Sequence, residues 1–224
     1  MHNLIPSTVY FNSSMDQDAL KKLLVLFEKN IRPDGVRNRA YLKLIWNRGT
    51  NRVYPAENQA YFQSADCNEM DGGKIRNFAV MDRAILDLSV MQNVIDVNLR
   101  MIRDFAPLQH HQELVLGLHF IQYKVSQYGA SYSSPDGLHR DDEPLVFVHL
   151  LNLTSNAIGG DNLMADFETR EITNVVRLEK PLETLVLTRD YFHAVTALGS
   201  REGEARRDIL LFTVEPGETQ VASA

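Results

Sequence analysis

The sequence predicts a mainly β protein with α-helices in its N-terminal half. Up to about residue 113, apolar residues recur at helical spacing in two long stretches. From residue 114 onward the chain consists of short apolar or alternating runs separated by turn residues, which is typical of an all-β sandwich or barrel. With 224 residues, 44% of them hydrophobic, the chain can bury a sizeable core.

Two segments of the N-terminal half are expected to be helical. In residues 15–29, apolar side chains such as Leu20, Leu23 and Phe27 lie at helical spacings. Asp16 and Asp18 stand near the start of this segment, where the helix dipole favours acids. Residues 81–101 show the same periodicity and predict a second helix, or two helices in sequence.

The second half of the chain contains the expected strands. Breaks at residues 133–137, 158–161 and 199–203 contain residues that tolerate turn geometry. The simplest architecture is a double-stranded β-helix, a jelly-roll of the cupin-like kind, over about residues 114–215, with helical support from about residues 1–113. The runs that predict strands are residues 114–125, 144–153, 162–166, 171–176, 184–188, 193–197 and 207–214.

Composition restricts the organisation and the partners of the protein. One domain over residues 1–224 is expected, because no linker or repeat separates two halves. The net charge of -6 is spread along the chain, which argues against a nucleic-acid partner. The single cysteine, Cys67, and the absence of a secretory signal in residues 1–14 favour the cytoplasm. No run approaches the roughly 20 apolar residues that span a bilayer, so no membrane association is expected. A homo-oligomer is left open.

The strongest chemical signal is the tripeptide His139-Arg140-Asp141, followed by His193 in a later run. Residues spaced i, i+2 point to the same side of an extended segment, so His139 and Asp141 can share one metal ion. With His193 they would occupy one face of an octahedral Fe(II) and leave positions for a 2-oxo acid and O2. The tripeptide alone is weak evidence, because such a sequence is more often a solvated turn.

Arg207 strengthens this interpretation. It lies in the strand run after His193, and its planar guanidinium can bind the distal carboxylate of 2-oxoglutarate through two hydrogen bonds, a fit that lysine lacks. Without the three metal ligands, a surface charge or ion pair would be the better explanation. Strand alternation lets only one of Arg206 and Arg207 point inward, and the spacing favours Arg207.

Other residues are candidates for contacts with the cosubstrate. Thr196, shortly after His193, and Tyr123, in the run before the His-x-Asp motif, have hydroxyl groups that can reach 2-oxoglutarate. Simple packing within the strands explains either residue about as well. His119 and His149 lie in apolar runs and are expected to be structural.

A free amino-acid substrate needs a cation for its carboxylate and an acceptor for its ammonium group. Arg37, Arg39 and Tyr41, with Glu143 beside the motif, offer such groups, and Ser134 can donate to a carboxylate. A charged solvated face, or a simple turn in the case of Ser134, is the more ordinary explanation for these residues.

Segments in order from about residue 60 to 215 resemble the bacterial Fe(II)/2-oxoglutarate-dependent amino-acid hydroxylases of the L-isoleucine dioxygenase type. The resemblance implies a jelly-roll core, with Fe(II), 2-oxoglutarate and O2 as cofactor and cosubstrates. It also implies hydroxylation of an aliphatic C–H bond of isoleucine, leucine, methionine, pipecolate or a similar amino acid. Related halogenases replace the carboxylate ligand by a small residue, so Asp141 favours hydroxylation. The matching segments are 61–64 (YFQS), 71–76 (DGGKIR), 117–119 (GLH), 132–135 (YSSP), 138–144 (LHRDDEP), 157–163 (AIGGDNL), 181–186 (PLETLV), 192–196 (FHAVT) and 207–211 (RDILL).

Two alternatives remain open at this point. A cupin-type metalloenzyme would share the barrel and the metal but would not use 2-oxoglutarate, and it would need no inward arginine at position 207. A catalytically silent barrel that binds a small ligand would have no chemical need for all three of His139, Asp141 and His193.

Overall fold

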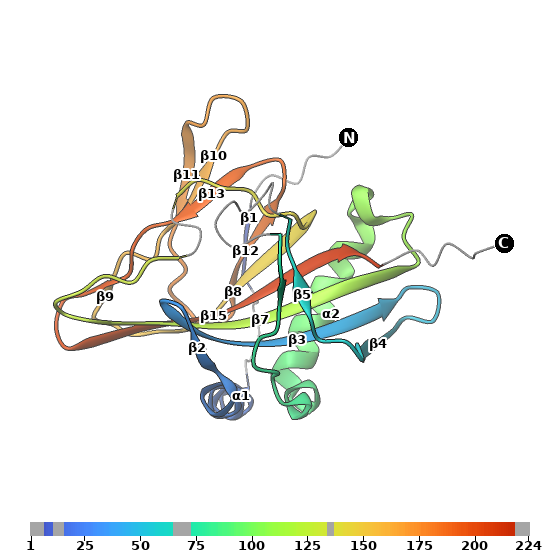
Figure 1. Ribbon diagram of the computed structural model, residues 1–224, viewed down its shortest axis with the longest axis horizontal. Coiled ribbons are helices and arrows are strands. Elements are labelled where there is room, and N and C mark those ends of the chain that lie inside the picture. Colours follow the sequence, from blue (N-terminus) through green and yellow to red (C-terminus); the bar gives the residue numbers. More distant parts are fainter. Residues whose placement is uncertain (1–6, 11–15, 65–72, 134–136, 218–224) are drawn as a thin grey trace.

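The computed structural model describes residues 7–10, 16–64, 73–133 and 137–217. One large antiparallel sheet runs through the molecule, with helices on one face and smaller sheets on the other (Figure 1). This is the double-stranded β-helix, or jelly-roll, that the sequence predicts. The large sheet contains, in spatial order, β1 (Ser7–Tyr10), β12 (Glu183–Thr188), β8 (Leu145–Leu153), β15 (Glu204–Pro216), β7 (Glu113–Ser126), β3 (Arg37–Asn47) and β2 (Arg32–Asp34), with β4 (Arg52–Pro55) paired to β3.

The smaller sheets and the helices complete the fold. One small sheet has the order β11 (Ile172–Val176), β10 (Asn162–Ala165) and β13 (Phe192–Val195). Two further pairs join β14 (Gly199–Ser200) to β9 (Ala157–Ile158) and β5 (Tyr61–Phe62) to β6 (Ile75–Arg76). The helical segments are α1 (Gln17–Asn30), η1 (Arg83–Asp87), α2 (Ser89–Asp104) and η2 (Ala106–Leu108).

Helix α1 begins where the sequence predicts. The Asp16 carboxylate accepts hydrogen bonds from the backbone N–H groups of Asp18 and Ala19, both at 3.0 Å, and so caps the free amide groups of the first turn. The buried face of the helix includes Leu23 and Phe27, both fully buried against the large sheet. Burying each such side chain contributes about 1.5–3 kcal/mol, so α1 is held mainly by its apolar face.

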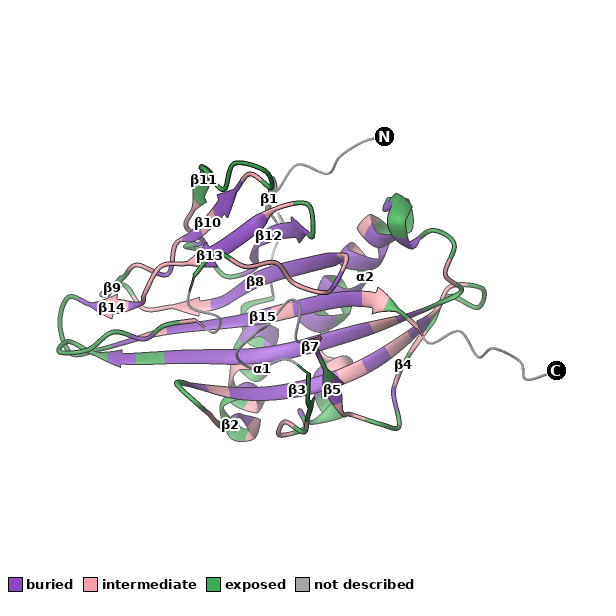
Figure 2. Ribbon diagram, turned by 45° about the horizontal axis from the view of Figure 1, so that its top comes forward, coloured by how far each residue is buried: buried purple, intermediate pink, exposed green. Residues whose placement is uncertain are grey.

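The two faces of the large sheet pack against different layers. Phe120 of β7 faces α1 and contacts Phe27, with 6.1 Å between the ring centroids. The next residue, Ile121, belongs to a second apolar cluster with Val148 of β8 and Met164 of β10. Because successive side chains of a strand alternate between faces, β7 is buried on both sides over most of its length (Figure 2).

The N-terminal half contains more β-structure than the helical support predicted for about residues 1–113. Strand β3 lies inside the large sheet, between β7 and β2, and it supplies part of the sheet's inner face. Its residues 40–42 are all buried, because helices cover one side and the functional cavity lies on the other. This double burial removes the simple alternation that would reveal a strand.

The remaining predicted elements are confirmed within one to three residues at most ends. Each of the seven predicted C-terminal runs contains an observed strand, from β7 to β15. The periodic segment at residues 81–101 forms two helical pieces, η1 and then α2.

Candidate metal and cosubstrate site

The His-x-Asp motif and β13 are held together by backbone hydrogen bonds. The N–H of His139 donates to the carbonyl of His193 at 2.9 Å, and the N–H of His193 donates to the carbonyl of His139 at 2.8 Å. The two imidazole rings therefore lie side by side, with 4.3 Å between their centroids. Asp141 completes the group, since its carboxylate oxygens lie 3.4 Å from His193 Nε2 and 4.0 Å from His139 Nε2.

This group fits a divalent metal. One possible ligand atom from each of His139, Asp141 and His193 lies within 4.8 Å of the others. His139 Nδ1 lies 2.9 Å from the carbonyl of Gly137 and must donate to it, which leaves Nε2 as the free lone pair. Burial lowers the pKa of His193 to about 4, so the ring of His193 is neutral at physiological pH. Arg140 points elsewhere and stacks over Phe167 at 4.8 Å.

The three residues open onto a cavity that encloses about 830 Å³, part of it open to solvent. Its floor is the inner face of the large sheet. The register places Tyr123 opposite Arg207, Ile121 opposite Ile209 and His119 opposite Leu211. These three pairs follow one another along the cavity, so residues of a single strand can contact ligands at both ends of the cavity.

Arg207 lies at one end of the cavity, as the sequence predicts. Its side chain is buried, and its Nη2 has no hydrogen-bond partner in the described part of the chain. Burial lowers the pKa of this guanidinium, which reflects the cost of a buried charge without an anion. Arg206 instead points to the other face, where it pairs with Glu28 at 2.8 Å and Asp208 at 2.6 Å.

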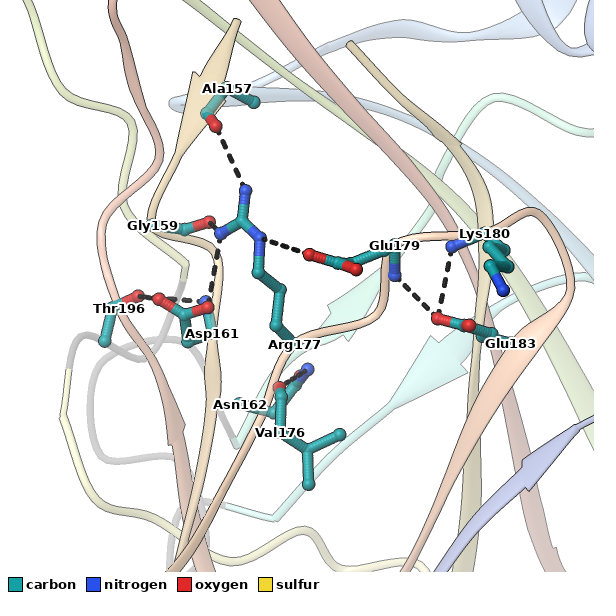
Figure 3. A network of polar contacts seen from close by, with 10 residues as sticks. All are labelled: Ala157, Gly159, Asp161, Asn162, Val176, Arg177, Glu179, Lys180, Glu183 and Thr196. Atoms are coloured by element: carbon teal, nitrogen blue, oxygen red, sulfur yellow. Dashed lines mark hydrogen bonds and ion pairs between the residues drawn. The ribbon is translucent and has the colours of Figure 1, made fainter. Parts of the chain in front are cut away.

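A polar network holds the loop after β9 (Figure 3). Gly160 of this loop packs against the side chain of Arg207. Arg177 donates to the carbonyls of Ala157, at 3.0 Å, and Gly159, and it pairs with Asp161 at 3.2 Å. The Thr196 hydroxyl accepts from the N–H of Asp161 at 2.9 Å. Thr196 is therefore bound to the loop. It does not line the main cavity but, together with Arg207, lines a small cavity beside it.

The other end of the cavity also contains an arginine. Arg76 lies there, together with the buried side chain of Glu143. Arg39, opposite Ile121 on β7, lines the middle of the cavity, and Arg37 lies one row further along, beside Tyr123. The Nε of Arg76 has no hydrogen-bond partner among the described residues, while the Nε of Arg39 lies 3.4 Å from a carboxylate oxygen of Asp34. The Tyr61 hydroxyl donates to Glu143 at 3.0 Å, while burial and then the charge of Asp141 raise the pKa of Glu143.

Most of the expected residues meet at this cavity. Tyr123, Glu143 and Arg37 line it. Tyr41 lies beside the cavity but not in its lining; its ring packs against His119, with 4.5 Å between centroids. Ser134 lies outside the described residues.

The sequence interpretation gave no role at the site to two lining residues, Tyr61 and His119, and only a weak one to Arg76. Tyr61 and Arg76 come from the short strands β5 and β6, which have too few residues to show a pattern. Both stand in segments of the family resemblance, and Arg76 is otherwise no more than another basic residue that could hold a substrate carboxylate.

Comparison with known proteins decides the family. The profile of the 2OG-Fe dioxygenase family matches residues 25–213. The chain belongs to this family. As a 2OG-Fe dioxygenase it is an oxidoreductase, and both alternatives, the metalloenzyme without 2-oxoglutarate and the silent barrel, are set aside.

Curated relatives and a solved structure agree with the assignment. L-Isoleucine-4-hydroxylase of Bacillus thuringiensis is 44% identical over 161 residues, 71% of this chain and 67% of that protein. The 3(1)-hydroxy-L-isoleucine 4-dioxygenase of Pantoea ananatis is 37% identical over 164 residues, 72% of this chain and 66% of that protein. The crystal structure of IDO from Bacillus thuringiensis superposes with a TM-score of 0.84 at 34% identity and covers 95% of this chain and 94% of that one. The sequence matches thus span about two thirds of each curated relative's length.

Family membership implies Fe(II), 2-oxoglutarate and O2, and the residues present fit them. His139, Asp141 and His193 provide the two imidazoles and one carboxylate that suit Fe(II). The unpaired Nη2 of Arg207 suits a carboxylate of the cosubstrate. No helix in the part of the chain that the structure describes is long and apolar enough to cross a membrane.

Proposed function

We propose that this dioxygenase hydroxylates an aliphatic C–H bond of a free L-amino acid, isoleucine or a similar one such as leucine, methionine or pipecolate. In the complete reaction, 2-oxoglutarate and O2 are converted to succinate and CO2. One oxygen atom of O2 enters the succinate, and the other forms the new hydroxyl group of the amino acid. The names of the two curated relatives support an amino-acid substrate.

The distribution of charge in the cavity carries this proposal. One end offers Arg207 and Tyr123 to a carboxylate of 2-oxoglutarate. The opposite end offers Arg76 to a second carboxylate and Glu143 to an ammonium group, since Arg76 stacks over Tyr61 and the Tyr61 hydroxyl donates to Glu143. A zwitterionic amino acid and a dicarboxylate can therefore occupy the cavity together, each near groups of complementary charge.

Apolar residues also line the cavity. Val148, Leu187, Val195 and Leu211 line the cavity and suit the hydrocarbon side chain of an aliphatic amino acid. When bound by His139, Asp141 and His193, Fe(II) would supply the oxidising chemistry together with O2. The protein's own residues orient the substrate, keep water away from the target C–H bond and hold both carboxylates.

The proposal is tested by supplying purified protein with Fe(II), 2-oxoglutarate, air and a pool of free amino acids that includes pipecolate. We expect succinate together with an amino acid whose mass has increased by one oxygen atom. The Asp141→Ala variant, which lacks the carboxylate ligand, should form neither product. Succinate without any hydroxylated amino acid would contradict the proposed substrate class, because it would mean that the cosubstrate turns over without a free amino acid as acceptor.

The cytoplasmic location and assembly into a homo-oligomer stay predictions from the sequence. Size-exclusion chromatography with light scattering measures the oligomeric state directly.

A further inference from the structure

His119 differs from an ordinary core histidine. Its side chain is 2% exposed and lines the cavity, yet neither ring nitrogen has a hydrogen-bond partner in the described part of the chain. His149, equally buried on β8, shows the usual pattern: Nδ1 lies 2.7 Å from the Thr184 hydroxyl and Nε2 lies 2.9 Å from the Asn98 amide. A buried polar group without a partner is costly, so the two free nitrogens of His119 indicate a ligand.

The position of His119 separates it from the cosubstrate end. On β7 it lies four residues from Tyr123, which faces Arg207, a separation of about 13 Å along an extended strand. It therefore cannot share the 2-oxoglutarate carboxylate bound at Arg207. Its ring packs against Tyr61, over which Arg76 stacks and whose hydroxyl donates to Glu143, so His119 lies at the end of the cavity that contains Arg76 and Glu143.

The surroundings of His119 fix both its orientation and its charge. Its ring packs against Tyr41, Tyr61 and Phe78 at centroid distances of 4.5, 4.8 and 6.2 Å. Burial, and then the nearby charge of Arg39, hold the pKa of His119 well below its usual value. The neutral ring has one N–H donor and one lone pair.

The cavity end that His119 faces has many donors and few acceptors. Arg76 can bind the carboxylate of an amino acid, whereas Arg37 and Arg39 already pair with Asp34, each at 3.4 Å. The ammonium group of the amino acid has three N–H donors that need acceptors. Glu143 is one acceptor, and the hydroxyl of Tyr61 connects to it. His119 packs against the ring of the same tyrosine, so Glu143 and His119 both contact Tyr61.

We propose that the neutral imidazole of His119 accepts a hydrogen bond from the α-ammonium group of the amino-acid substrate and thereby selects amino acids over other carboxylic acids. This inference rests on the proposed function and adds a specificity residue to it. The aromatic residues around His119 hold the ring in place, and Glu143 supplies the second acceptor.

The test compares two ligands that differ only in the ammonium group. Anaerobic calorimetry on the protein with Fe(II) and 2-oxoglutarate measures the Kd of the preferred amino acid and of the carboxylic acid with hydrogen in place of the amino group. We expect His119→Leu to raise the Kd of the amino acid about tenfold or more, the effect of losing a hydrogen bond to a charged group. The Kd of the acid without the amino group should stay nearly unchanged. His119→Gln, whose amide oxygen can accept, should recover part of the loss.

Further measurements distinguish a failure of the His119 role from misfolding and from a failure of the proposed function. Thermal unfolding and the Kd of 2-oxoglutarate, measured on each variant, show whether the fold and the cosubstrate end are intact; if His119→Leu does not fold, His119→Gln carries the comparison with the two acids. If His119→Leu weakens the binding of both ligands equally, or of neither ligand, the role of His119 is overturned while the proposed function stands. If the unaltered protein binds no amino acid at all, the proposed function fails, and the inference fails with it.

Discussion

Gly160 packs directly against the side chain of Arg207. A Cβ atom at position 160 would lie 3.1 Å from Arg207 Cδ and 3.5 Å from its Nε. The backbone of Gly160 also has a φ of +75°, which L side chains rarely adopt. The loop after β9 therefore approaches the arginine as closely as it does because this residue has no side chain.

The Gly160→Ala variant should bind 2-oxoglutarate more weakly. The added methyl group would push the guanidinium of Arg207 out of its place, and we expect the Kd to rise about tenfold, the effect of roughly one lost charge-assisted hydrogen bond. Gly203→Ala is the matched control, because Gly203 has a φ of +60° but nothing within 4 Å of the new Cβ. Calorimetry should show unchanged 2-oxoglutarate binding in the control; an equal loss in both variants would mean that backbone strain, rather than crowding of Arg207, is responsible.

The geometry of the Arg207 guanidinium matters as well as its charge. Arg207→Lys keeps the charge but loses paired hydrogen bonds, so we expect the Kd of 2-oxoglutarate to rise by about 10- to 100-fold. Arg206→Lys is the control, because Arg206 pairs with Glu28 and Asp208 on the opposite face. If the two variants bind 2-oxoglutarate equally well, Arg207 does not hold the cosubstrate.

Thr196 and Arg177 should act through the same loop. Both contact Asp161, and neither lines the main cavity. We expect Thr196→Val and Arg177→Met each to raise the KM for 2-oxoglutarate about two- to tenfold, by loosening the loop that packs against Arg207. The KM of the double variant should rise by less than the product of the two single increases, because two residues that contact the same partner do not act independently. Fully multiplicative effects would instead indicate separate roles, including a direct contact of Thr196 with the cosubstrate.

His149 should make stability depend on pH. Burial lowers its pKa in the folded protein from 6.5 to about 3. Between these values the unfolded chain binds a proton at this residue and the folded chain does not, so its contribution to stability is complete above 6.5 and is lost as the pH falls toward 3. The free energy of unfolding should fall by up to about 1.4 kcal/mol per pH unit from this residue.

Urea unfolding at neutral and mildly acidic pH measures this dependence. His149→Gln, whose amide oxygen can still accept from Asn98, should lower the stability at neutral pH but reduce the slope with pH. A slope identical to that of the unaltered protein would show that His149 does not remain neutral on folding.

The sequence predicted those parts of the site that depend on local geometry. The i, i+2 spacing places His139 and Asp141 on one side of an extended segment, and alternation distinguishes Arg207 from Arg206 without knowledge of the fold. The orientation of His119 was harder to predict. Strand β7 is buried on both faces, so alternation does not tell which face borders the cavity and which meets the helices.

Some contributions to the site depend entirely on tertiary structure. Arg76 reaches the cavity from β6, a strand of two residues, and stacks over the ring of Tyr61 at 5.0 Å. The arginine side of β3 faces the cavity only because β3 pairs with β7 in the large sheet. Neither relationship is contained in the spacing of residues along the chain.

The most direct test of the central claim follows the oxygen atoms. The unaltered protein, supplied with Fe(II), 2-oxoglutarate, the preferred amino acid and O2 of a heavy oxygen isotope, is analysed by mass spectrometry of both products. The account predicts one heavy oxygen atom in succinate and one in the hydroxylated amino acid, and neither product from His139→Ala. Label in neither product, or hydroxylation that proceeds without 2-oxoglutarate, would contradict the assignment of the cavity to Fe(II) and 2-oxoglutarate.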